Sequence, residues 1–220
     1  MTTQKRRKPM TAAEHQKLLD ADPVFQAQRA ERERIRQQEI AKLRVASKPL
    51  VEDLHAAGFP VNGVWDFVNT RERYDAALPV LATHLERNYP PEILEGIARA
   101  MAVPEAMPWR EDFIRLIRIR PPMPEGKRDG FRDGLAIAIG NTTGPHNVWE
   151  TIALLRDTTL GSSRILMLSV LGKVKEPEVK EALLELRECD PELRRVISDL
   201  GWVKKLDREH KQAGRSISRD

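Results

Sequence analysis

The stretch LELRECDPELRRVISDLG, residues 184–201, carries the pattern that decides the fold. Leu184 and Leu186 continue the apolar side of a helix that begins upstream. Asp190-Pro191 follows, and proline stops one helix while being favoured in the first turn of the next. The stretch therefore predicts two consecutive helices, the second opened by Leu193 and closed by Gly201.

The same arrangement occurs three more times upstream. A residue that opens a second helix is followed nine positions later, or eight in the last case, by a small closing residue. The opening and closing pairs are Ile93 and Ala102, Phe131 and Gly140, Ser163 and Gly172, and Leu193 and Gly201. In three of the four units an arginine directly follows the opening residue: Arg132, Arg164 and Arg194. Self-similarity at a nearly fixed period indicates a repeat architecture.

Each unit also has a first helix with an apolar stripe. In the first unit Tyr74, Ala77, Leu78, Leu81 and Leu85 lie on one face at helical spacing. A helix pair of this size cannot bury its own stripe, whereas stacked pairs share one continuous core. We therefore predict an all-α fold, an α-solenoid of about four helix pairs. The proline-rich residues 121–127 are an expected insertion at a rim of this solenoid.

These patterns resemble the HEAT repeat, in its PBS-lyase-like form. Leu78-Pro79-Val80-Leu81 with Pro91-Glu92-Ile93 resembles one unit, and residues 184–201 resemble another, with its loop aspartate, apolar-Arg step and terminal Leu-Gly. The resemblance covers about residues 70–201, and its lead-in is similar to small bacterial HEAT-repeat proteins of unknown function. It implies a right-handed superhelix whose usual role is to bind other proteins. In the first unit Leu94 stands where the family has arginine, and in the third Ser163 stands at an apolar position.

Three segments are predicted along the chain. Residues 1–46 form a basic leader and a charged helical arm, with a capping box at Thr11 and Glu14 and a second helix beginning at Asp22-Pro23. Residues 47–203 form the solenoid. Residues 204–220 form a basic C-terminal tail that we expect to be disordered.

The net charge of +4 is unevenly distributed. Residues 1–44 carry 11 Lys/Arg and 6 Asp/Glu, residues 45–200 carry 20 and 24, and residues 201–220 carry 6 and 3. The basic ends are expected to keep the protein soluble, and nucleic acid could contact the protein through them. The acidic middle does not favour a duplex-binding surface on the solenoid.

The composition points to a cytoplasmic protein. There is no 18-residue apolar run that could span a bilayer, and no apolar stretch follows the basic leader, so we expect neither membrane insertion nor secretion. The single cysteine, Cys189, excludes an internal disulfide framework and fits a reducing compartment.

Seven residues are candidates for the concave face or its rim. The resemblance implies that Arg132, Arg164 and Arg194 contact the aspartate or carbonyls of the preceding unit, as a ladder along the stack. The alternative to this structural role is that the three arginines line an anion-binding groove on the concave face. The complete candidate set for a partner-binding surface is Glu95, Arg99, Arg128, Arg132, Asp133, Arg164 and Arg194.

No catalytic, cofactor or metal residues are predicted. Gly140-Asn141-Thr142-Thr143-Gly144 lacks the Lys-Ser/Thr ending of a phosphate-binding loop, and no strand precedes Ser162 to make a nucleophile elbow. The five histidines are not paired at helical spacing with one another or placed beside the cysteine. We therefore predict a protein without a cofactor and without enzymatic activity.

The leading hypothesis is a protein-protein interaction module or adaptor that uses the concave surface of the solenoid. An immunity or antitoxin protein that binds one cognate toxin is a specialised form of it. The alternative is a HEAT-like DNA-binding protein or alkylpurine DNA glycosylase, for which Trp109 with Asp112, or Trp149 with Glu150, would serve at the lesion. A bilin lyase is a third possibility, although no chromophore site is apparent.

Overall fold

The structure is a computed structural model that describes residues 10–120 and 128–217. Every regular element within these ranges is helical, which confirms the all-α prediction. The chain divides into two compact units, Met1–Ala46 and Ser47–Asp220, called unit 1 and unit 2 below. None of the described helices combines the length and the apolar character needed to cross a membrane.

Unit 1 consists of α1 (Ala12–Ala21) and α2 (Pro23–Ala46), whose N-terminal caps are those predicted. The Thr11 hydroxyl accepts from the Glu14 amide, and the Glu14 carboxylate accepts from the Thr11 amide at 2.9 Å. The Asp22 carboxylate accepts from the amide of Val24 at 2.9 Å. Neither helix contains a buried residue, so their caps and ion pairs, rather than a core, define them.

Unit 2 opens with two short helices, α3 (Lys48–Ala56) and α4 (Trp65–Asn69). Leu50, Leu54 and Phe67 are buried, and the ring of Phe67 packs edge-on against Phe59. Trp65 of α4 is 41% exposed.

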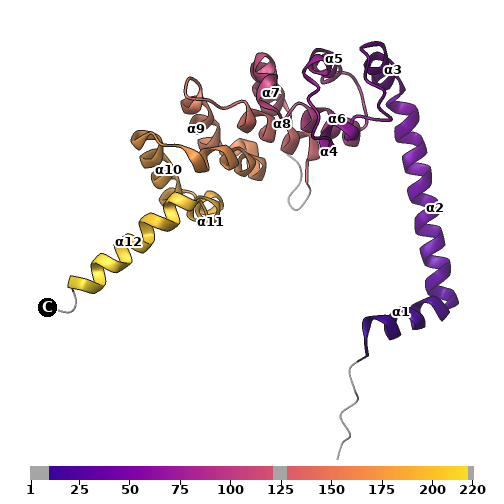
Figure 1. The fold of residues 1–220 in the computed structure, drawn as a ribbon, viewed down its shortest axis with the longest axis horizontal. Coiled ribbons are helices and arrows are strands. Elements are labelled where there is room, and N and C mark those ends of the chain that lie inside the picture. Colours follow the sequence, from indigo (N-terminus) through magenta and orange to yellow (C-terminus); the bar gives the residue numbers. More distant parts are fainter. Residues whose placement is uncertain (1–9, 121–127, 218–220) are drawn as a thin grey trace, which may run out of the picture. The chain divides into compact units, whose positions relative to one another are not determined.

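The rest of unit 2 is a series of helix hairpins, each with a first and a second helix (Figure 1). Short 3₁₀ turns, η1 (Asp75–Ala77) and η2 (Pro104–Trp109), lead into the first two hairpins. The hairpins are α5 (Leu78–His84) with α6 (Pro91–Ala100), α7 (Arg110–Ile119) with α8 (Gly130–Asn141), α9 (Val148–Arg156) with η3 (Thr158–Lys173), and α10 (Pro177–Cys189) with α11 (Pro191–Ser198). A final helix, α12 (Gly201–Ile217), follows.

Packing of the second helices follows chain order. α6 contacts α8, α8 contacts η3, and η3 contacts α11, while each second helix also contacts the first helix of its own hairpin. We call α6, α8, η3 and α11 the second-helix layer. Its centre, α8, is buried along most of its length, including Leu135 and Ile139, which are 0% exposed. The apolar stripes of successive hairpins therefore share one core.

Two parts of the chain differ from the expected regular helix pairs. The second helix of the third hairpin, η3, is 3₁₀ rather than α and is interrupted at Gly161, whose φ of 61° suits glycine. At the C-terminus, helix α12 continues to Ile217, where a disordered tail was predicted from residue 204. Trp202, Val203 and Leu206 supply the apolar side that favours a helix there. The expected insertion at residues 121–127 lies outside the described residues.

Candidate interaction surface

Arg132, Arg164 and Arg194 occupy equivalent places in three hairpins. Each side chain extends from the start of a second helix to carbonyl groups near the end of the first helix of the same hairpin. Arg132 donates to the carbonyls of Ile117 and Arg120. Such carbonyls have no partner within their own helix, and a nearby cation stabilises the negative end of the helix dipole.

The other two arginines make the same kind of contact. Arg164 donates to the carbonyl of Leu155 at 2.8 Å, and Arg194 donates to those of Arg187 at 3.1 Å and Glu188 at 2.8 Å. The expected ladder ran to the preceding unit, whereas these carbonyls belong to the same hairpin. The arginines thus tie the two helices of a pair together.

Arg164 additionally connects two hairpins. It is 3% exposed and pairs with Asp190 and, at 2.7 Å, with Glu192, both at the start of α11. Burial disfavours the charge of Arg164, but the hydrogen bonds to the two carboxylates outweigh burial and raise its pKa. The Arg164 hydrogen bond lowers the pKa of Asp190, burial partly opposes this, and the Leu193 amide lowers it further. Asp190 also caps α11 by accepting from the Glu192 and Leu193 amides.

The other four candidate residues form one charge network on the second-helix layer. Glu95 accepts from Arg99 at 2.8 Å and from Arg128 at 3.1 Å, and Arg128 also donates to Asp133 at 2.7 Å. Ser163 of η3 completes the network by donating to Asp133 at 2.8 Å. The network joins α6, α8 and η3 and contains equal numbers of arginines and carboxylates. It therefore offers a free anion no excess of positive charge.

Close approach of the backbones brings these residues together. A Cβ atom at Gly134 of α8 would lie 2.7 Å from the Cβ of Ala98 and 3.3 Å from both the Arg99 amide nitrogen and the Glu95 carbonyl oxygen. These atoms belong to α6 and cannot move aside as a flexible side chain can. Glycine at this position lets α6 and α8 pack closely beneath the charge network.

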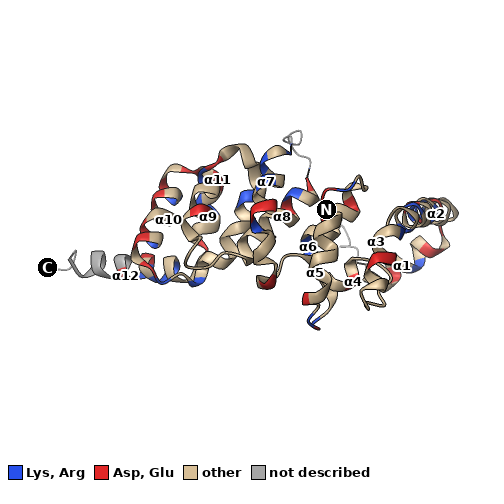
Figure 2. Cartoon of the chain, turned by 90° about the horizontal axis from the view of Figure 1, so that it is seen from above, with Lys and Arg blue, Asp and Glu red and all other residues tan. Residues whose placement is uncertain are grey.

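Acidic and basic residues are interspersed along the helices of unit 2 rather than separated onto faces of one sign (Figure 2). Among the described residues, no group of three or more histidine, cysteine, aspartate or glutamate side chains is arranged to hold a metal ion. The thiol of Cys189 is exposed. Because acidic and basic residues alternate along the helices, the surface of the second-helix layer is of mixed charge.

Arg110 is a central buried residue that the sequence did not reveal. It is 5% exposed and donates to the Glu150 carboxylate at 3.0 Å, the Ile139 carbonyl at 2.6 Å and the Thr151 hydroxyl at 2.8 Å. Its acceptors lie 29 to 41 residues away, so no local pattern indicates them. The side chain links α7 to the end of α8 and the start of α9.

A second unpredicted cluster surrounds His84. Its Nε2 lies 2.9 Å from the Asp53 carboxylate, and its Nδ1 lies 2.7 Å from the Tyr89 hydroxyl. The imidazole is 0% exposed, and burial lowers its pKa despite the opposing hydrogen bond to Asp53. The cluster connects α3 to α5 and to the turn that follows α5.

No family model, curated protein sequence or solved structure matches this chain.

Proposed function

We propose that unit 2 is a HEAT-like α-solenoid that binds a protein partner through its second-helix layer and catalyses no reaction. The order of contacts from α6 through α8 and η3 to α11 is the observation that carries this proposal. Helices stacked in this way present a continuous surface, and repeat proteins use such surfaces for binding. The recurring arginine contacts within hairpins support a repeated structural unit.

The chemistry of this surface favours protein over nucleic acid as its ligand. The outward stripe of α8 consists of the half-buried Gly130, Asp133, Ile137 and Asn141. Ile165 and Leu166 of η3 are half-buried too, so the surface mixes apolar and polar groups. Protein interfaces have this mixed composition, whereas nucleic acid requires a concentration of positive charge.

Substitution of Ile137 tests the proposal. Ile137→Arg replaces an accessible aliphatic side chain in the middle of the second-helix layer with a long charged one, and it is expected to abolish partner binding. Ile119→Arg is the matched control, because it makes the same replacement at a residue that is 67% exposed at the end of a first helix, α7. Ser169→Arg, at an exposed position of η3, repeats the test on the neighbouring helix.

The measurement is co-purification of tagged full-length chain from cells of the source organism, with quantitative mass spectrometry. Proteins retained by the wild-type chain and by Ile119→Arg, but lost from both layer variants, would support the proposal. The same retained proteins in all four samples, or none in any, would contradict it. Far-ultraviolet circular dichroism confirms that each variant is folded.

A further inference from the structure

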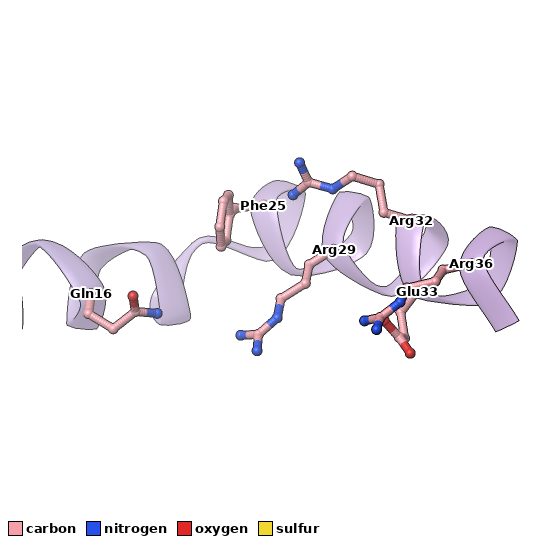
Figure 3. A pocket seen from close by; sticks show the side chains of 6 residues that line it. All are labelled: Gln16, Phe25, Arg29, Arg32, Glu33 and Arg36. Atoms are coloured by element: carbon pink, nitrogen blue, oxygen red, sulfur yellow. The ribbon is translucent and has the colours of Figure 1, made fainter. Parts of the chain in front are cut away.

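Helix α2 in unit 1 carries a row of arginines along one side. At 100° per residue, Arg29, Arg32 and Arg36 fall within an arc of about 60° that also includes Phe25. These four residues line a surface hollow of about 520 Å³ together with Gln16 of α1 and Glu33 (Figure 3). We call Phe25, Arg29, Arg32 and Arg36 the arginine stripe. Because α2 buries no residue, the stripe does not serve a core.

Charge is distributed unevenly around α2. On the opposite side of α2, Arg34 pairs with Glu31 at 2.6 Å, and one turn beyond the stripe Lys42 pairs with Glu39 at 2.7 Å. Within the stripe, Arg36 pairs with Glu33 at 3.5 Å, whereas neither Arg29 nor Arg32 forms an ion pair with any described residue. Like charges one turn apart repel each other on a helix. An anionic ligand would reduce that repulsion, and at Arg29 and Arg32 it would displace no carboxylate of the described residues.

The stripe also includes an aromatic ring. The Arg32 guanidinium lies over the ring of Phe25, 6.0 Å from its centroid, whereas the Arg29 side chain extends to the opposite side in this view, the side on which Gln16 lies (Figure 3). Guanidinium groups bind phosphate oxygens, and aromatic rings stack on unpaired bases. From Phe25 to Arg36 the stripe extends about 16 Å along the helix axis, which is the length of about five stacked nucleotides.

We propose that the arginine stripe binds single-stranded nucleic acid, with Arg29, Arg32 and Arg36 on the phosphodiester backbone and Phe25 against a base. A cationic surface with an adjacent aromatic ring is how proteins hold single strands without reading their sequence. An acidic protein segment is less suited, because the stripe lacks the apolar anchors that a helix or strand of a protein partner would require. The phosphodiester backbone of DNA and RNA supplies the same contacts, so both are expected to bind.

Two double variants of the full-length chain test the proposal. Arg29→Gln/Arg32→Gln removes the unpaired charges of the stripe, and Arg34→Gln/Lys42→Gln removes the same formal charge from elsewhere on α2. Binding of fluorescein-labelled oligodeoxythymidylate and oligouridylate of about 20 nucleotides is followed by anisotropy from about 50 to 200 mM salt. The stripe variant is expected to bind at least about tenfold more weakly than wild type. The slope of the logarithm of its binding constant against the logarithm of salt concentration is expected to be less steep by about 1.4, because two phosphate contacts are lost. The control variant is expected to stay within about twofold of wild type.

Phe25→Leu separates stacking from charge. It is expected to weaken binding about fivefold, because stacking is lost, while leaving the slope unchanged. The proposal is overturned by equal weakening in the two double variants, by an absence of saturable binding at low salt, or by equally effective competition from a duplex of the same length or from poly-glutamate. Circular dichroism checks that helicity is retained in each variant.

Discussion

At the scale of the residue, two arginines of α7 differ in how they are surrounded. Arg110 is buried and satisfies acceptors from α8 and α9, whereas Arg115 is exposed and pairs with Glu86 and Asp112. Removing a buried donor leaves its acceptors without partners, while water replaces an exposed one. The burial of an arginine is therefore a better guide to its contribution to the free energy of unfolding than the number of its partners.

Replacing each of these arginines with methionine tests that statement. Methionine keeps an unbranched apolar stem, so the change isolates the hydrogen bonds. Arg110→Met is expected to lower the free energy of unfolding by about 2 to 3 kcal/mol. Arg115→Met is expected to leave the urea midpoint close to that of wild type. Equal midpoints for the two variants would show that the Arg110 contacts contribute nothing beyond those of a surface pair.

At the scale of the element, the contact between α6 and α8 depends on Gly134. Gly134→Ala introduces a methyl group 2.7 Å from the Cβ of Ala98, so the two helices must separate. Alanine favours the helix by about 1 kcal/mol, but the cost of overpacking is larger, so the free energy of unfolding is expected to fall by about 1 kcal/mol. Gly201→Ala is the control. Gly201 is the first residue of α12, and an added Cβ atom there would meet no atom within 4 Å, so this variant is expected to be as stable as wild type. Urea unfolding followed by circular dichroism measures both, and an unchanged Gly134→Ala midpoint would contradict the close approach.

How far the sequence predicts an element depends on where its determinants lie. The predicted caps at Thr11 and Asp22 were confirmed because cap and amide are at most three residues apart. The 3₁₀ geometry of η3 was not anticipated, because its apolar residues fit an α-helical pattern and packing decides between the two. The candidate surface is similar in this respect. Sequence analysis identified Glu95, Arg99, Arg128 and Asp133 as candidates, but their mutual pairing depends on how α6 and α8 pack. The cluster around His84 likewise depends on the packing of α3 and α5.

At the scale of the whole molecule, the two units obtain their order from different sources. In unit 2, buried leucines and isoleucines from successive hairpins form one core. In unit 1, no residue of α1 or α2 is buried, and α2 relies on pairs such as Arg34 with Glu31. Burial of apolar surface makes unfolding cooperative, whereas isolated exposed ion pairs contribute little. The units should therefore differ sharply in resistance to heat.

Deletion of residues 1–46 tests this division. The chain that begins at Ser47 is expected to unfold at the same temperature as the full-length chain, because the deletion removes no buried side chain of α1 or α2. The full-length chain should show an additional, broad loss of helicity at lower temperature, since α2 melts without a core. Circular dichroism at 222 nm and calorimetry measure the two transitions. A drop of several degrees in the main transition after deletion would show that unit 1 stabilises unit 2, and the two units would then have to be treated as one cooperative structure.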